Sequence, residues 1–161
     1  MALVKRFKEN PLISPTSDEK WQDFSTFNAC PFKIEDKIHL LYRAMSKKTK
    51  KEGVELRISS IGHAVSEDGI HFEKRRQLIK PEKEWEKFGC EDPRVTKIGN
   101  KYYIFYTALS KYPFTAEGIK IGVAITEDFK KFKKYPVTTF NSKAMALFPE
   151  KINGKYAAVL S

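Results

Sequence analysis

The chain has 161 residues, 41% hydrophobic and 13% aromatic, with a formal net charge of +10 at pH 7. This composition favours a folded domain over a disordered chain, and no stretch approaches the run of about 20 apolar residues that spans a membrane. We therefore expect one domain over residues 1–161, with neither signal peptide nor anchor, no membrane partner and a cytoplasmic location. The positive charge comes mostly from scattered lysines without a nucleic-acid motif, so we interpret it as a solvated surface and expect no nucleic-acid partner.

Residues 1–26 form an irregular lead-in, because residues 10–15 are interrupted by prolines. A first repeat begins near residue 27, and Asn28 opens it. The side-chain amide of Asn28 both donates and accepts hydrogen bonds, which suits a sugar hydroxyl, although an asparagine that caps a turn explains the position equally well.

Residues 38–44 alternate as a strand that ends in Tyr42 and Arg43. An arginine at the end of an inner strand is costly unless it meets an anion. Its planar guanidinium suits a phosphate or a carboxylate, and an ion pair with an internal acid such as Glu91 or Asp92 is the equal alternative to a ligand contact.

Residues 47–53 read as a lysine-rich loop, and residues 54–66 as one alternating strand that contains His63. We consider His63 a candidate for the site, with a structural histidine as the alternative. Residues 78–88 read as a loop or a short helical turn.

Two adjacent carboxylates, Glu91 and Asp92, are followed by Pro93 and Arg94. Proline cannot occupy a central ladder position, so we expect Asp92 at the mouth of a short strand over residues 94–98. Gly99 and Asn100 then form a two-residue turn into a return strand over residues 101–108. The alternative is a surface pair of Asp92 with Arg94 that caps this turn.

Residues 112–118 are a connection, and residues 119–126 form the next strand. Lys143 lies in the following stretch, and Lys151 lies near the start of a third inner strand, where an exposed lysine is the alternative to a ligand contact. Residues 156–160 form an apolar edge strand, which predicts a homo-oligomer.

Cysteines and histidines give no metal signal. Cys30 and Cys90 are expected to be reduced and buried, and His39, His63 and His71 lack the spacing of zinc ligands. We therefore predict no metal site.

Internal repeats organise the chain. Residues 33–44 match residues 97–108 at an offset of 64, residues 151–160 match again 54 positions further on, and residues 61–72 match residues 121–132 at an offset of 60. Alternating hairpins at a fixed period indicate an all-β propeller with four strands per blade, with repeats that begin near 27, 90 and 146. Under this alignment Asn28 is equivalent to Asp92, and such positions converge on the central channel, where ligands bind.

The ordered set of motifs resembles glycoside hydrolase family 130, the β-mannoside phosphorylases and related glycosidases. The segments that carry the resemblance are Phe27-Asn28, Leu41-Tyr-Arg43, Ile61-Gly62, Ser66-Glu-Asp-Gly69, Glu91-Asp-Pro-Arg94 and residues 147–156. The resemblance implies a five-bladed β-propeller of roughly twice this length, of which this chain holds about two and a half blades.

The resemblance also assigns roles. It implies that Asp92 is the proton donor, acting through a hydroxyl of the mannose unit. The residues it implies for sugar contacts are Asn28, Arg43, Glu91, Arg94 and His63. The residues it implies for phosphate are Arg43, Lys143 and Lys151.

The expected activity is inverting cleavage of a β-mannosidic bond in an oligosaccharide, with inorganic phosphate as co-substrate and no cofactor. A phosphorylase needs only one carboxylic acid, because phosphate itself attacks the anomeric carbon, whereas an inverting hydrolase needs a second carboxylate. Two alternatives remain open: a hydrolase that uses water, and a noncatalytic partial propeller that binds carbohydrate or assembles with itself.

Overall fold

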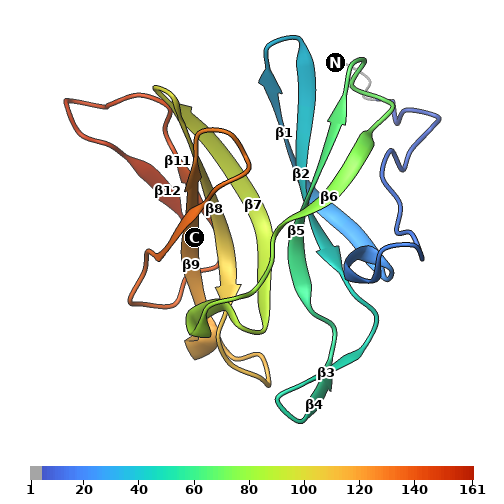
Figure 1. Cartoon of the computed structure of the whole chain (residues 1–161). Coiled ribbons are helices and arrows are strands. Elements are labelled where there is room, and N and C mark those ends of the chain that lie inside the picture. Colours follow the sequence, from blue (N-terminus) through green and yellow to red (C-terminus); the bar gives the residue numbers. More distant parts are fainter. Residues whose placement is uncertain (1–4) are drawn as a thin grey trace.

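The computed structural model describes residues 5–161 and shows two four-stranded antiparallel blades side by side (Figure 1). The strands of the first blade are β1 (Ser25–Ile34), β2 (Lys37–Met45), β5 (Ser59–Ser66) and β6 (Glu73–Ile79). The strands of the second blade are β7 (Gly89–Ile98), β8 (Lys101–Leu109), β9 (Ile119–Thr126) and β10 (Lys133–Pro136). One parallel bridge between Ser59 and Gly89 joins the blades.

Smaller elements connect or follow the blades. They are the hairpin of β3 (Thr49–Lys51) with β4 (Val54–Leu56), the hairpin of β11 (Met145–Leu147) with β12 (Ala158–Leu160), and the 3₁₀ turns η1 (Lys20–Gln22), η2 (Glu84–Glu86) and η3 (Ala116–Gly118). The predicted all-β partial propeller is confirmed. The prediction of one strand over residues 54–66 is wrong, because the β3–β4 hairpin ends at Leu56 before β5 begins at Ser59. No helix among residues 5–161 is long and apolar enough to cross a membrane.

Each blade buries one tyrosine against a glycine of the neighbouring strand. Gly62 stands opposite Tyr42 in the β2–β5 register, and Gly122 stands opposite Tyr106 in the β8–β9 register. A Cβ atom on Gly62 would lie 2.4 Å from the Tyr42 ring, and one on Gly122 would lie 2.8 Å from the Tyr106 ring. The repeated Ile-Gly pairs of the sequence therefore mark the places where a tyrosine ring lies flat on the next strand.

The two blades pack face to face around one apolar core. Leu41, Ile61, Cys90 and Ile104 are completely buried in it. Alternate residues of a strand share a face, so Arg43 and His39 flank Leu41 on the same face of β2. The interface is thus apolar in its middle and polar at both ends.

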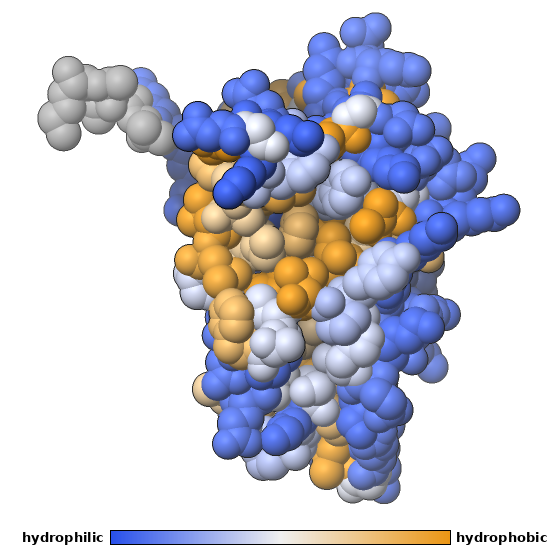
Figure 2. All heavy atoms as spheres, turned by 90° about the vertical axis from the view of Figure 1, so that its left-hand side faces the viewer, coloured by the Kyte–Doolittle hydropathy of each residue, from blue (hydrophilic) through white to orange (hydrophobic). Residues whose placement is uncertain are grey.

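The outer face of the second blade is apolar as well. Phe105, Ile121 and Val123 are buried there beneath Met145 and Leu147 of the β11–β12 hairpin. Apolar side chains gather in the middle of this side of the molecule in Figure 2. The strand β12 is exposed along its length, in keeping with the predicted edge strand, and self-association stays a prediction.

Candidate active site

Matching bulges interrupt the first strand of each blade. The register of β1 against β2 shifts between Phe27 and Cys30, and the register of β7 against β8 shifts between Glu91 and Arg94. The bulges place Asn28 at φ 50° and Asp92 at φ 51°, a left-handed conformation that asparagine and aspartate tolerate better than other side chains.

The prediction that Asp92 stands at the mouth of a strand beginning at residue 94 is therefore wrong. The strand β7 starts at Gly89, and Asp92 lies inside it. The bulge accommodates Pro93, since a bulged residue is released from the ladder and needs no N–H donor. Bulges re-aim side chains, and this pair turns Asn28 and Asp92 toward each other.

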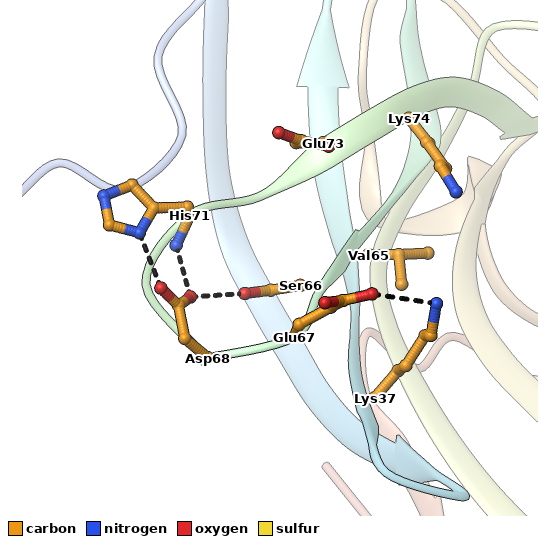
Figure 3. A pocket seen from close by; sticks show the side chains of 8 residues that line it. All are labelled: Lys37, Val65, Ser66, Glu67, Asp68, His71, Glu73 and Lys74. Atoms are coloured by element: carbon orange, nitrogen blue, oxygen red, sulfur yellow. Dashed lines mark hydrogen bonds and ion pairs between the residues drawn. The ribbon is translucent and has the colours of Figure 1, made fainter.

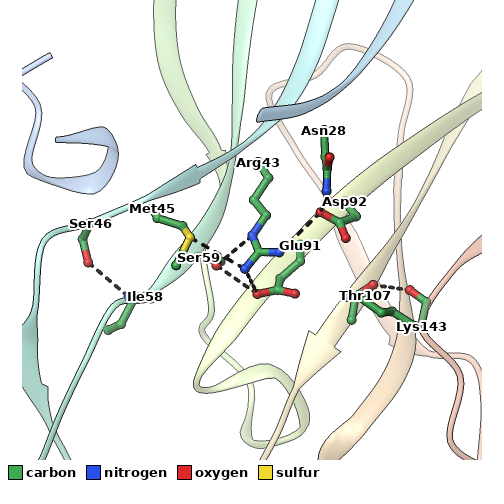
Figure 4. Close-up of polar contacts among 10 residues, drawn as sticks. All are labelled: Asn28, Arg43, Met45, Ser46, Ile58, Ser59, Glu91, Asp92, Thr107 and Lys143. Atoms are coloured by element: carbon green, nitrogen blue, oxygen red, sulfur yellow. Dashed lines mark hydrogen bonds and ion pairs between the residues drawn. The ribbon is translucent and has the colours of Figure 1, made fainter. Parts of the chain in front are cut away.

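Asp92 is held by two side chains of the first blade (Figure 4). The Nδ2 of Asn28 donates a hydrogen bond of 2.7 Å to Oδ1 of Asp92. The Nη1 of Arg43 lies 3.6 Å from the same oxygen. The repeat alignment that made Asn28 equivalent to Asp92 thus describes two residues in direct contact.

Glu91 takes the other side of the Arg43 guanidinium. Arg43 Nη2 forms an ion pair with Oε1 of Glu91. Arg43 Nε donates to Oγ of Ser59 at 3.1 Å, and this hydroxyl donates to Glu91 Oε1 at 3.0 Å. We call these five residues, Asn28, Arg43, Ser59, Glu91 and Asp92, the carboxylate cluster. Of the two alternatives for Arg43, the ion pair with internal acids is the one that the structure contains.

The cluster is more buried on its Glu91 side than on its Asn28 side. Burial raises the pKa of the Glu91 carboxyl, while the Arg43 charge and the Ser59 hydrogen bond oppose the rise. The side chain of Lys143 is exposed, and its charge also acts on Glu91. The Phe27 ring lies under the Arg43 guanidinium, with the guanidinium carbon 4.7 Å from the ring centroid, and Phe27 is 38% exposed. The arrangement can present a carboxyl group to a ligand that arrives over Asn28 and Phe27.

Two predicted site residues, Arg94 and Lys151, make their contacts outside the carboxylate cluster. Arg94 is exposed, and its guanidinium donates to the carbonyl of Pro93 at 2.7 Å, so the alternative of a pair between Asp92 and Arg94 is not what forms. Lys151 lies beyond β11 rather than at the start of a third inner strand, and its Nζ is 5.3 Å from the centroid of the Tyr156 ring. Both side chains are exposed.

His63 belongs to the other end of the blade interface. Its Nε2 is 2.9 Å from Nδ1 of His39, and its Nδ1 accepts from Nε of Arg76 at 3.2 Å. The ring stacks on Phe129 at a centroid distance of 5.7 Å. The structure therefore joins His63 to an aromatic and histidine group and does not bring it to the carboxylate cluster.

Ser59 and Phe27 are site residues that sequence reasoning missed. The repeat alignments make Ile119 the counterpart of Ser59 and Glu91 the counterpart of Phe27. Matching the repeats draws attention to Asn28 and Asp92, because similar side chains occupy the equivalent positions. It does not single out Ser59 and Phe27, because their counterparts in the second blade are different residue types.

A separate hollow of about 360 Å³ lies at the β5–β6 turn, lined by charged side chains (Figure 3). Asp68 accepts hydrogen bonds from Ser66 and His71, and Glu67 pairs with Lys37 at 3.1 Å. These contacts stabilise the turn. Among residues 5–161, no group of three His, Cys, Asp or Glu side chains is placed to hold a metal ion.

The two four-stranded blades define a partial β-propeller. The model of glycoside hydrolase family 130, described as beta-1,4-mannooligosaccharide phosphorylase, matches residues 5–160, and the chain belongs to this family. It is 37% identical to a beta-1,2-mannobiose phosphorylase of Thermoanaerobacter sp. over 97% of this chain and 53% of that protein.

Solved structures agree. A glycosyl hydrolase from Bacteroides ovatus superposes with a TM-score of 0.82 at 27% identity, over 97% of this chain and 52% of that one. Another matches with a TM-score of 0.79 at 27% identity, over 94% of this chain and 50% of that one. Its description states that the family of mannoside phosphorylases contains glycoside hydrolases that target beta-1,2 mannosidic linkages in Candida mannan. The chain spans about half the length of the relatives it matches.

Proposed function

We propose that this chain carries the acid half of a β-mannoside phosphorylase site, with Asp92 as the proton donor. The observation that carries the proposal is the placement of Asp92: a left-handed bulge aims its carboxyl at Asn28, and one oxygen is fixed at 2.7 Å from that amide. In the reaction, the Asp92 proton passes, through a mannose hydroxyl, to the glycosidic oxygen as the bond from that oxygen to the anomeric carbon breaks. A phosphate oxygen attacks the same carbon from the opposite face, giving mannose 1-phosphate and a shortened oligosaccharide.

Phosphate needs cations that are not already neutralised. Lys143 is exposed beside the cluster, and Lys151 and Arg94 are exposed without an ion pair among the described residues. We propose Lys143 as the first phosphate contact, with Lys151 as the second. Arg43 is engaged by Glu91 and Asp92, so we propose that it organises the carboxylates and the sugar rather than the phosphate.

Hydrolysis by water is the second candidate, favoured by the family 130 structure described in connection with hydrolases of beta-1,2 mannosidic linkages. An inverting hydrolase needs a base carboxylate about 6.5–9.5 Å from the acid. Glu91 is a poor base, because its carboxylate is paired with Arg43 and accepts from Ser59. A noncatalytic carbohydrate-binding module is the third candidate.

The test is incubation of the purified protein with β-1,2-mannobiose and inorganic phosphate, with Asp92→Asn as the matched variant. We expect phosphate-dependent mannose 1-phosphate, lost by at least about 100-fold in Asp92→Asn, because general acid catalysis contributes about 10²–10⁴-fold. Free mannose that forms without phosphate would favour the hydrolase. An inactive protein that still binds the disaccharide would favour the binding module.

A further inference from the structure

Two adjacent carboxylates share a single guanidinium in the carboxylate cluster, and they share it unequally. We infer that Glu91 is a positioning residue which, together with Ser59, holds the Arg43 guanidinium closer to Glu91 than to Asp92, so that Asp92 can serve as the acid. This inference rests on the proposed role of Asp92 as the acid.

The geometry shows the unequal division. Nη2 and Nε of Arg43, its two well-placed donors, are directed to Glu91 and Ser59, whereas Nη1 stands 3.6 Å from Asp92, beyond hydrogen-bond range. Asp92 instead receives its short hydrogen bond from Asn28, an uncharged amide. The neutral amide thus makes the short contact with Asp92, while the arginine pairs closely with Glu91 and more distantly with Asp92.

The unequal pairing of Arg43 with the two carboxylates is particular to the contact between the first and second blades. In the repeat alignment, the counterpart of Arg43 is Thr107, which stands opposite Glu91 in the β7–β8 register, and the counterpart of Ser59 is Ile119. Arg43, Ser59 and Glu91 are therefore not part of the structural pattern that the two blades share. Burial of Glu91 adds to the case, since a buried carboxylate needs a paired cation.

The charges around the two carboxyl groups predict the direction of the effect of replacing Glu91. The groups that face Asp92 and Glu91 are Arg43 from β2, Asn28 from β1, Ser59 from β5 and the Lys143 charge ahead of β11. Replacing Glu91 by glutamine removes the like charge beside Asp92 and frees Arg43 to pair with Asp92. Both changes favour the ionised form of Asp92, so an acid at this position would lose its proton at lower pH.

The experiment follows the Asp92 carboxyl carbon by carbon-13 NMR across pH in wild type, Glu91→Gln and the control Glu117→Gln. Glu117 lies on η3, and its exposed carboxylate pairs with Lys111. We expect the Asp92 titration midpoint to fall by about one pH unit or more in Glu91→Gln, the size of effect of a newly paired cation, and to stay unchanged in Glu117→Gln. The milder Ser59→Ala keeps every charge and should lower the midpoint in the same direction, which preserves the test if Glu91→Gln does not fold.

An unchanged midpoint in Glu91→Gln, or in Ser59→Ala if only that variant folds, overturns the inference. In an active protein, the alkaline limb of the kcat profile should move to lower pH with the NMR midpoint, while a merely structural role would lower activity equally at every pH. The two proposals fail separately: a protein without phosphorolysis removes the proposed function but leaves the titration readable, and an active protein with an immobile midpoint removes only this role of Glu91.

Discussion

Acid should destabilise this protein through the histidine pair at the end of the blade interface. Arginine can only donate, so the hydrogen bond from Arg76 requires an unprotonated Nδ1 on His63. Neutral His63 then carries its proton on Nε2 and donates it to Nδ1 of His39. A proton added to either acceptor nitrogen breaks one of these bonds and sets a new positive charge beside Arg76 and Lys37.

The magnitude follows from the pKa of His63, which burial, with the Arg76 charge adding to it, lowers from 6.5 to about 4. The unfolded chain therefore binds more protons than the folded one between these values. The contribution is complete above pH 6.5, and it is lost as the pH falls toward 4. A shift of about 2.5 units at about 1.4 kcal/mol per unit makes it about 3 kcal/mol.

Urea denaturation at pH 7 and pH 4.5 measures this loss, and His63→Gln is the variant that removes it. We expect the free energy of unfolding of the wild type to fall between the two pH values by about 2–3 kcal/mol more than that of His63→Gln. The control is His71→Gln: Asp68 raises the pKa of exposed His71, so protonation of His71 stabilises the folded state as the pH falls, and this variant should lose at least as much stability as the wild type. An equal loss in wild type and His63→Gln would refute the reasoning, because the loss would then not come from His63; Glu91 cannot mimic it, since burial raises its pKa and its protonation therefore stabilises the folded state as the pH falls.

Two further predictions concern the second blade. Gly122→Ala should lower the free energy of unfolding by about 1–3 kcal/mol, because the added methyl group would lie 2.6 Å from the Trp85 ring and 2.8 Å from the Tyr106 ring, and the tryptophan fluorescence should shift with it. Glu86→Gln should cost about 3–5 kcal/mol, because it removes the close carboxylate partner of the nearly buried Lys134 ammonium and leaves only Glu82, at 3.9 Å, as an ion-pair partner. The double variant with Lys134→Met should recover most of the loss in urea denaturation, and a single variant as stable as wild type would contradict the buried pair.

The sequence predicted the blades well because strand and turn patterns that are weak individually recur at regular offsets. One strand-and-turn pattern over residues 97–108 is ambiguous by itself, but its match to residues 33–44 strongly favours two strands joined by a two-residue turn. The same offset of 64 also relates Trp21 to Trp85. The ring centroids lie 6.3 Å apart for Trp21 and Tyr42 and 6.2 Å apart for Trp85 and Tyr106. The two tryptophans are thus a further element of the repeat that the sequence contains.

The bulges were not predictable in the same way. The rule that proline leaves the ladder is correct for Pro93, but it has two solutions: the strand starts after the proline, or it bulges around it. Local sequence does not choose between them, because the choice depends on β8 continuing opposite β7 as far as Leu109. Once the bulge is known, the residue types become intelligible, since its left-handed position tolerates Asn28 and Asp92 far better than a branched side chain.

The site residues that pattern reasoning could not bring together are united by the interface between blades. Arg43, Leu41 and His39 lie on one face of β2, so the ion pair, the apolar core and the histidine pair form one continuous contact with the second blade. Asn28, Arg43 and Ser59 come from the first blade, whereas Glu91 and Asp92 come from the second, and the carboxylate cluster exists only while the blades are docked. Acid that weakens the histidine end therefore acts on the same docking that holds the cluster. A loss of cluster geometry below pH 6 would be partly structural in origin, and the His63→Gln variant separates that part from the titration of the carboxylates themselves.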